Sequence, residues 1–265
     1  MKKVLITGAG SGMGNAVAKV LANNGYDVYS LDIKKATNLP DNVTQFCVDI
    51  TDTASIQKVY DEVSKQTDHL DAIINFAGII MMDSLIEISE EDFVKIFNVN
   101  LFGTYRVNKI FAPLVIKNKG KIIVTTSELA PNKILPFNAI YSVSKKALDA
   151  YAEGLRMELG LLGVQVITLR PGAVKTELIQ SSSTALDKLV NNTSLYKNFT
   201  KNFKKIVDAN QSGTIPAEKI GKLVLKILNK KSPKCVYTKN ANIKLKLLNL
   251  VPAKTRLGLI KLLLK

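Results

Sequence analysis

Tyr141 and Lys145 are the two residues of this chain whose types and spacing point most directly to chemistry. They stand four positions apart in Tyr-Ser-Val-Ser-Lys, at the start of a predicted amphipathic helix, so both side chains lie on one helical face. A free tyrosine has a pKa of about 10, and a nearby cation lowers it by favouring the phenolate. Such a tyrosine could exchange a proton with a substrate oxygen. Because Tyr-x-x-x-Lys also occurs by chance in helices, this reading depends on further motifs.

A glycine-rich turn near the start of the chain is the first further motif. Residues 3–7 form an apolar strand, residues 14–24 have helical periodicity, and the pattern T-G-x-x-x-G-x-G between them contains Gly8, Gly12 and Gly14. Glycines let the backbone approach a pyrophosphate closely, and the helix N-terminus offers free N–H groups to phosphates. The turn therefore predicts a dinucleotide site, with a tight turn that binds no ligand as the alternative.

Asp32 follows the next predicted strand, residues 27–31, and lies 24 positions after Gly8. An acid about 20 residues past such a turn can accept hydrogen bonds from an adenosine ribose. It repels a 2′-phosphate and therefore favours NAD over NADP. Lys34 and Lys35 weaken this argument because two cations accommodate a phosphate, so NADP is not excluded. An ordinary acid at a turn is the alternative for Asp32.

With these motifs the chain resembles the short-chain dehydrogenase/reductase family over nearly its whole length. Asn75-Phe76-Ala77-Gly78 is similar to the family's Asn-Asn-Ala-Gly signature, with Phe76 in place of the second Asn. The resemblance implies that Tyr141 and Lys145 are the catalytic pair and that Asn100 helps to hold a water in a proton relay. It also implies contacts with the cofactor for Gly8, Ser11, Gly12, Met13, Gly14, Asp32, Asp49, Ile50, Asn75, Ala77, Gly78, Tyr141, Lys145, Pro171, Gly172, Val174 and Thr176.

The catalytic serine of the family usually lies 13 residues before the tyrosine, and that position is Glu128 here. The segment 120–127, Gly-Lys-Ile-Ile-Val-Thr-Thr-Ser, resembles the family's strand and its terminal serine, and it ends at Ser127. A strand end fixes geometry better than a loop does, because loops tolerate insertions. We therefore assign the role to Ser127 and expect Glu128 beside the site, where it shapes substrate choice.

Strand and helix patterns alternate along the chain, which is typical of a parallel sheet covered on both faces. The predicted strands are 3–7, 27–31, 43–48, 70–75, 120–126, 164–169 and 234–238, and the predicted helices are 14–24, 53–66, 90–117, 142–162 and 217–229. The helix after Tyr141 should bury a stripe formed by Leu148, Tyr151, Leu155, Leu159 and Leu162. The prediction is an α/β fold, a single Rossmann-like domain over 1–265 with a doubly wound parallel sheet and flanking helices.

Cysteine and histidine content limits the chemistry that is available. Cys47 and Cys235 lie far apart in predicted strands, so we expect small core residues rather than a disulfide or a metal pair. His69, the single histidine, precedes a strand, so no metal site or histidine triad is expected. The N-terminus lacks a signal-peptide pattern, and no run of about 18 apolar residues is present. The expected location is therefore cytoplasmic.

The net charge of +15 is concentrated toward the C-terminus. Residues 201–265 contain 16 Lys and Arg against Asp208 and Glu218, and the segment 240–265 alternates lysine with leucine. This basic amphipathic segment is either a helix pair with a solvated lysine face over the substrate pocket or a peripheral contact with an anionic membrane. Nucleic-acid binding is not expected, because no stacking platform or DNA-binding motif accompanies the charge.

Residues 177–215 form a segment that is longer than most loops of compact domains, which is typical of a mobile substrate lid. Leu135 and Phe137 lie in the loop before Tyr141, and together with the lid they predict an apolar pocket. The apolar lid residues are Leu178, Ile179, Leu186, Leu189, Leu195, Phe199 and Phe203.

These features predict an oxidoreductase that transfers a hydride between a nicotinamide cofactor and an apolar secondary alcohol or ketone, steroid-like or fatty-acyl-like. The C-terminal layout is similar to that of hydroxysteroid- and retinol-dehydrogenase-like members of the family. The alternatives are an NADPH-dependent 3-ketoacyl reductase and a non-catalytic sensor or scaffold that binds the cofactor. The resemblance also implies a homodimer or homotetramer.

Overall fold

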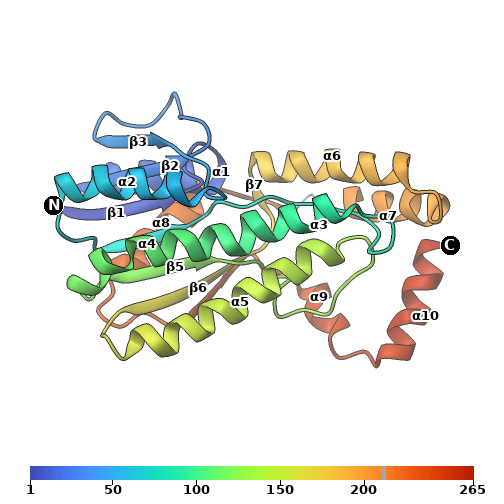
Figure 1. Cartoon of the computed structure of the whole chain (residues 1–265). Coiled ribbons are helices and arrows are strands. Elements are labelled where there is room, and N and C mark those ends of the chain that lie inside the picture. Colours follow the sequence, from blue (N-terminus) through green and yellow to red (C-terminus); the bar gives the residue numbers. More distant parts are fainter. Residues whose placement is uncertain (210–212) are drawn as a thin grey trace.

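A parallel β-sheet of seven strands forms the centre of the computed structural model, which describes residues 1–209 and 213–265, with residues 179 and 180 as backbone only (Figure 1). The strand order is β3-β2-β1-β4-β5-β6-β9. Each predicted strand is present, with its ends within two residues of the predicted ones. The strands are β1 Lys2–Thr7, β2 Tyr26–Asp32, β3 Val43–Cys47, β4 Ala72–Asn75, β5 Lys121–Thr125, β6 Gln165–Pro171 and β9 Val236–Lys239.

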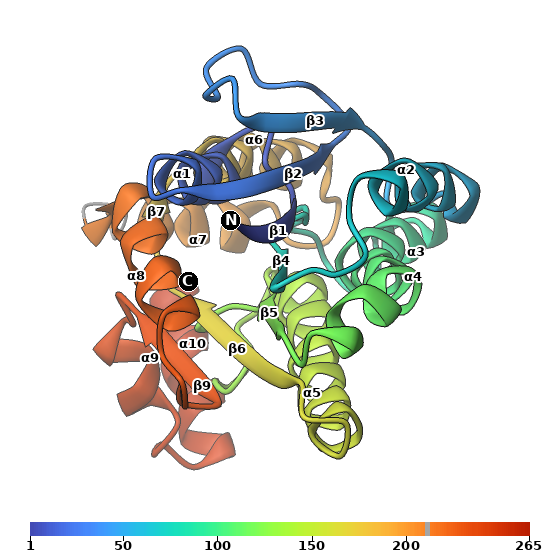
Figure 2. The same ribbon diagram turned by 90° about the vertical axis from the view of Figure 1, so that its left-hand side faces the viewer.

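Helices cover both faces of the sheet (Figure 2). One face packs against α1 (Gly12–Ala22) and α8 (Glu218–Leu228), and the other packs against α2 (Thr53–Gln66), α4 (Thr104–Lys117) and α5 (Ala139–Gly160). Side chains alternate along each strand, so Val4 and Ile6 of β1 face α1 and α8, whereas Leu5 faces the opposite core. The predicted doubly wound α/β fold is confirmed.

The predicted helix 90–117 is a continuous helical rod with a π-helical interruption. It consists of α3 (Glu90–Phe97), the π-helical segment η1 (Asn98–Gly103) and α4. A Cβ on Gly103 would lie 2.5 Å from the Cδ1 atom of Ile50, so a larger residue here would have to displace that side chain. π-Helical turns are frequent at functional sites, and this one contains Asn100.

The segment 177–209 is helical, so the expectation of a long loop is wrong there. It forms α6 (Glu177–Asn192) and α7 (Lys197–Ala209), and the short strand β7 (Val174–Lys175) before it pairs with β8 (Ile215–Pro216). Leu186, Leu189 and Phe203 are buried, while Leu195 is exposed. The rest of the predicted lid includes 210–212 and the side chain of residue 179, which lie outside the described part.

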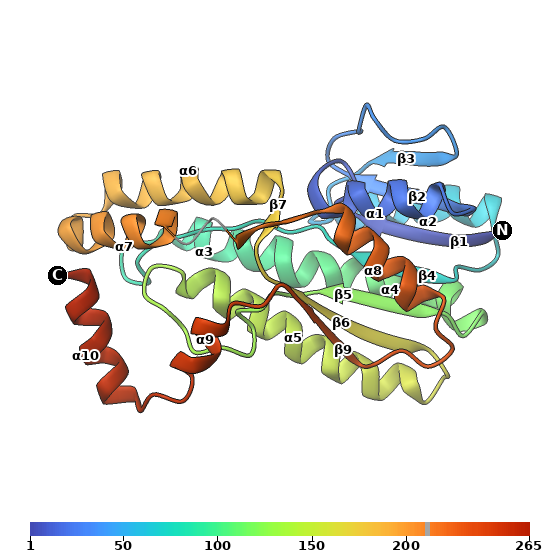
Figure 3. The same ribbon diagram turned by 180° about the vertical axis from the view of Figure 1, so that it is seen from behind.

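The C-terminal segment forms the helix pair that the sequence allowed, α9 (Ile243–Leu248) and α10 (Ala253–Leu264). Helix α10 lies beside α7, at the end of the molecule away from the N-terminus (Figures 1 and 3). Its last turn buries Leu264 in an apolar cluster with Phe137 and Phe203. This cluster joins the C-terminus to the α6–α7 pair and to the loop before Tyr141.

Two smaller expectations are corrected by the structure, the core position of the two cysteines and the burial of Leu162. Cys47 and Cys235 are exposed free thiols at the end of β3 and just before β9, not core residues. Leu162 is 50% exposed because α5 ends at Gly160, two residues before it.

Among the described residues no helix has both the length and the apolar character that a membrane crossing requires.

Candidate active site

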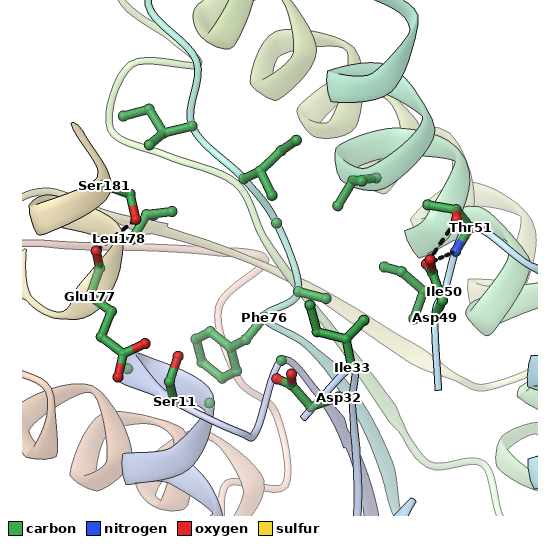
Figure 4. Close-up of a pocket in the computed structure, with 18 of the residues that line it drawn as sticks. Ser11, Asp32, Ile33, Asp49, Ile50, Thr51, Phe76, Glu177, Leu178 and Ser181 are labelled. Atoms are coloured by element: carbon green, nitrogen blue, oxygen red, sulfur yellow. Dashed lines mark hydrogen bonds between the residues drawn. The ribbon is translucent and has the colours of Figure 1, made fainter. Parts of the chain in front are cut away.

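A cavity of about 890 Å³ opens at the carboxyl ends of β1, β2, β3 and β4 (Figure 4). Open parallel sheets bind their ligands at this edge, on either side of the point where the strand order reverses. Many of the predicted cofactor-binding residues line it, namely Gly8, Ser11, Gly12, Met13, Gly14, Asp32, Asp49, Ile50, Ala77, Gly78 and Thr176.

The glycine turn is built as a cradle beside the cavity. Gly8 has a φ of +69°, and a Cβ on Gly14 would lie 2.0 Å from the carbonyl oxygen of Gly8, so neither position accepts a side chain. Ser11, at the N-cap of α1, makes no side-chain hydrogen bond to the first turn. The first N–H groups of α1 therefore lack a side-chain cap on the cavity side, an arrangement that suits a phosphate.

Acidic side chains stand at the ends of β2 and β3. The Asp32 carboxylate accepts hydrogen bonds from the backbone N–H of Gly10 (2.9 Å) and of Lys34 (3.1 Å), which ties it to the glycine turn. The Asp49 carboxylate accepts from the backbone N–H and the hydroxyl of Thr51, both at 2.8 Å. Both carboxylates are held by backbone contacts along the cavity wall (Figure 4).

Ser127, Tyr141 and Lys145 come together next to this cavity. Ser127 follows the end of β5, and Tyr141 and Lys145 lie in the first two turns of α5. The Tyr141 hydroxyl is hydrogen-bonded to that of Ser127. The Lys145 ammonium donates to the carbonyl of Thr125 (3.3 Å) and lies 5.9 Å from the centre of the Tyr141 ring.

Asn100 is fully buried and links the π-helical turn to the strand edge. Its amide oxygen accepts from the N–H of Ile79 (2.8 Å), and its amide nitrogen donates to the Ile79 carbonyl (3.0 Å) and to the Ser144 hydroxyl (3.0 Å). A Cβ on Gly78 would lie 3.1 Å from Asn100 Oδ1 and 3.3 Å from Lys145 Nζ. Gly78 lines the cavity, so the group of polar side chains adjoins the cavity at this glycine.

Burial controls the protonation of the Tyr141–Lys145 pair. It raises the pKa of Tyr141 to about 12, although the hydrogen bond with Ser127 acts in the opposite direction. It lowers the pKa of Lys145 to about 8. A low-dielectric site disfavours both charged forms, so the pKa of Tyr141 lies above its usual value and not below it, as the sequence had led us to expect.

Several predicted cofactor residues lie away from the cavity wall, namely Asn75, Pro171, Gly172 and Val174. Asn75 is buried, and its amide donates to Asn108 Oδ1 (2.9 Å) and to the Ile123 carbonyl (3.3 Å), so it joins β4 to α4 and β5. A Cβ on Gly172 would lie 1.9 Å from the carbonyl oxygen of Asn240. Asn75 and Gly172 therefore contact other parts of the protein and hold its segments together.

Glu128 binds the start of the C-terminal segment. Its Oε2 accepts from the backbone N–H of Asn242 (2.5 Å), the N-cap residue of α9, while its own N–H donates to the Pro171 carbonyl (2.9 Å). Burial raises its pKa. Glu128 therefore anchors the C-terminal segment to the loop before Tyr141. Ser127 is the residue whose hydroxyl is bonded to that of Tyr141.

The cavity wall also contains residues that were not among the predicted site residues, among them Phe76, Val94 and Lys95, together with Glu177, Leu178 and Ser181 from the predicted lid. Figure 4 shows the carboxylate of Glu177 pointing toward Ser11. Phe76 had a signal, because it departs from the Asn-Asn-Ala-Gly pattern. Val94 and Lys95 had none, because only the packing of α3 over the strand ends brings them to the cavity.

Comparison with known proteins identifies the family to which this chain is similar. A family model described as short chain dehydrogenase matches residues 2–187. A 3-ketodihydrosphingosine reductase of Bacteroides thetaiotaomicron is 27% identical over 230 residues, 87% of this chain and 84% of that protein. An NADPH-dependent 1-acyldihydroxyacetone phosphate reductase of Schizosaccharomyces pombe is 36% identical over 209 residues, 76% of this chain and 69% of that protein.

Among solved structures, an alcohol dehydrogenase from the archaeon Thermococcus sibiricus complexed with 5-hydroxy-NADP superimposes with a TM-score of 0.73. Its sequence is 23% identical, and the match covers 91% of this chain and 97% of that chain. This likeness concerns the fold, whereas the family model covers most of the chain. The chain therefore belongs to the short-chain dehydrogenase family, whose members are oxidoreductases that use a nicotinamide cofactor.

Proposed function

We propose that this chain transfers a hydride between a nicotinamide cofactor and an apolar ketone or secondary alcohol, with a long-chain acyl ketone as the preferred substrate class. The observation that carries the proposal is the hydrogen-bonded pair of hydroxyls, Tyr141 and Ser127, beside a buried lysine at the edge of the cavity. Two convergent hydroxyls suit a single carbonyl oxygen, because one can donate a proton while the other fixes the oxygen in place.

Tyr141 is the proposed general acid of the reduction. Because burial keeps its pKa at about 12, the phenol is neutral at pH 7 and holds the proton that the substrate oxygen receives. Ser127 donates a hydrogen bond to that oxygen. Lys145 is the nearby cation that favours the phenolate left behind, and Asn100 supports the relay that returns the proton from water.

The cofactor site is proposed along the cavity wall. The glycine turn and the uncapped start of α1 would hold the pyrophosphate, Asp32 the adenosine ribose, and Asp49 and Ile50 the adenine side. When bound, the nicotinamide supplies or accepts the hydride. Asp32 supports NAD, because its carboxylate would repel a 2′-phosphate.

NADP is the alternative cofactor. It is favoured because the fission-yeast relative is named as NADPH-dependent and the archaeal structure as a complex with 5-hydroxy-NADP. Lys34 and Lys35 are exposed beside Asp32 and would pair with a 2′-phosphate. Comparing turnover with NADH and NADPH at equal concentration decides between the two. A strong preference for NADPH in the wild-type chain would overturn the reading of Asp32.

The substrate class is supported by two observations. The two relatives are named for a ketodihydrosphingosine and an acyldihydroxyacetone phosphate, both of them ketones. In this chain α6 and α7, the proposed substrate lid within 177–215, share an apolar cluster with Phe137 from the loop that leads to Tyr141. The proposal extends the lid with the C-terminal segment 240–265, which contributes Leu264 to the same cluster. A homodimer or homotetramer is also proposed, as is usual in this family.

A panel of ketones tests the proposal. Oxidation of NADH and of NADPH is followed by absorbance with 3-ketoacyl thioesters, 2-alkanones of increasing chain length and 3-ketosteroids. We expect kcat/KM to rise with chain length, because each added buried methylene contributes about 0.8 kcal/mol. Tight cofactor binding without turnover of any member would instead support the alternative of a non-catalytic sensor.

A further inference from the structure

Helices α9 and α10, and the turn between them that contains Leu250, expose apolar side chains that no part of the described fold covers. These residues are Ile243, Leu247, Leu250, Leu257, Leu259, Leu262 and Leu263, each 43–80% exposed. On α10 the packed face consists of Arg256, Ile260 and Leu264. A surface helix normally places polar residues opposite its packed face, so exposed leucines at this density indicate a partner.

The exposed leucines of α10 are held in a fixed direction. Leu264 is buried in the cluster with Phe203, and its carbonyl accepts from the Asn202 side chain (3.2 Å). Leu259, Leu262 and Leu263 are spaced i, i+3 and i+4 and therefore share one helical face. Since the packed face fixes the rotation of the helix, this leucine face points away from the protein.

Helix α9 is fastened to the body of the protein by polar contacts. The backbone N–H of Asn242 donates to Glu128, and the Asn249 side chain accepts from the N–H of Lys133 (2.8 Å) and donates to Asn132 Oδ1 (2.7 Å). Both ends of α9 are therefore anchored to the loop before Tyr141, and its exposed Ile243 and Leu247 are presented to solvent by a structured element.

The charge around these helices selects the kind of partner. Residues 241–265 contain six Lys and Arg and no Asp or Glu. On α10, Lys254 and Lys261 are seven positions apart and share a face with Leu257, which lies three positions after the first and four before the second. A second copy docking through the same face would bring like charges together. Nucleic acid would satisfy the lysines but would leave the leucines in water.

We propose that α9 and α10 form a docking face that lies on an anionic lipid bilayer. The exposed leucines would enter the boundary between headgroups and acyl chains, and the lysines would contact lipid phosphates. The contact is peripheral, because among the described residues no helix is long and apolar enough to cross a membrane. The proposal is independent of the substrate.

Co-sedimentation of the full-length chain with vesicles tests the charge requirement. We expect binding to vesicles of phosphatidylcholine and phosphatidylglycerol at 7:3, and much weaker binding to phosphatidylcholine alone. Lys254→Gln with Lys261→Gln should weaken binding about 30-fold, since each lysine near an anionic surface contributes about 1 kcal/mol. The matched control is Lys58→Gln with Lys109→Gln, two exposed lysines on α2 and α4, which should bind as wild type does.

A single tryptophan tests whether the leucine face enters the lipid. The chain has no Trp, so Leu262→Trp provides one fluorophore at a position that is 75% exposed, and Leu161→Trp provides a control at an 88% exposed position after α5. We expect the emission of the first to shift to the blue on adding anionic vesicles, and that of the second to stay unchanged.

Three outcomes would overturn the proposal. The first is a wild-type chain that does not sediment with the anionic vesicles at 150 mM salt. The second is an equal loss of binding in the two lysine pairs, and the third is a blue shift of Leu262→Trp without lipid that grows with protein concentration. The last outcome would assign the face to a second copy of the chain. Circular dichroism of every variant separates these outcomes from misfolding.

Discussion

Lys145 lies in the interior beside Tyr141, and burial lowers the pKa of its ammonium to about 8. Tyr141 keeps its proton far above that pH, because its pKa is raised to about 12. As pH rises, the first proton lost from this pair is therefore that of Lys145. With a pKa of about 8, about ten in eleven molecules carry the ammonium at pH 7 and about one in eleven at pH 9. The kcat/KM of ketone reduction should therefore fall about tenfold over this interval.

Initial rates of ketone reduction from pH 6 to pH 10, at constant ionic strength and low ketone concentration, measure this profile. Lys145→Met should be slow and should lack the inflection near pH 8. Lys146→Met is the matched control, because burial lowers the pKa of Lys146 as well while its ammonium donates to the Ala130 and Asn132 carbonyls outside the site. An inflection that survives in Lys145→Met, or that disappears in Lys146→Met, would refute the assignment.

Three further predictions concern residues with defined contacts. Ser127→Ala should lower kcat about 10²–10³-fold, while Glu128→Gln should keep kcat and speed amide hydrogen exchange in α9; the reverse pattern would exchange their roles. Asp32→Ala should lower the ratio of kcat/KM with NADH to kcat/KM with NADPH at least about tenfold, because the contact with the adenosine ribose is lost. An unchanged ratio would show that Asp32 does not determine which cofactor is used. Glu87 accepts hydrogen bonds from the α6–α7 turn at Thr193, Ser194 and Leu195, which lower its pKa to about 2. The Glu87 carboxylate therefore stabilises the folded state above its unfolded pKa of 4.5, and this stabilisation is lost as pH falls toward 2. The urea midpoint of Glu87→Gln should accordingly fall less than that of wild type between pH 5 and pH 3. Equal falls in the two proteins would contradict this prediction.

The centre of the sheet could be predicted from sequence because strands such as β1, β4 and β5 are buried on both faces. Such strands are short continuous apolar runs, and those around residues 3–7 and 120–126 are bounded by turns. Helix 90–117 was predicted as a whole, but its π-helical turn was not. In that turn Gly103 packs closely against Ile50, which lies far away in the sequence.

The position of Ser127 could also be predicted, since a strand end is a reliable geometric marker even when the following loop varies in length. The exposure of Cys47 could not, because whether a residue at a strand end is covered depends on elements distant in the chain. The helices at 177–209 were missed for a related reason: their leucines form a buried stripe only with Phe137 and Leu264, which come from two other segments.

The pKa of Tyr141 shows the limit of spacing arguments. Four residues of separation place an ammonium near the phenol, and the structure agrees on that proximity. Burial, however, acts on both groups and favours the neutral form of each, and it is the larger cause of the shift. Sequence spacing identifies which residues are neighbours along a helix, but it does not show how deeply those residues are buried from water.

Tyr141→Phe is the most direct test of the central claim, because the change removes one oxygen from a buried ring and leaves its packing in place. We expect kcat for ketone reduction to fall about 10²–10⁴-fold, while the dissociation constant of the reduced cofactor, measured by its fluorescence, changes less than about threefold, because the nearby Lys145 and the glycine turn are unaltered. A phenylalanine variant that keeps more than a tenth of wild-type turnover would contradict the assignment of Tyr141 as the proton donor.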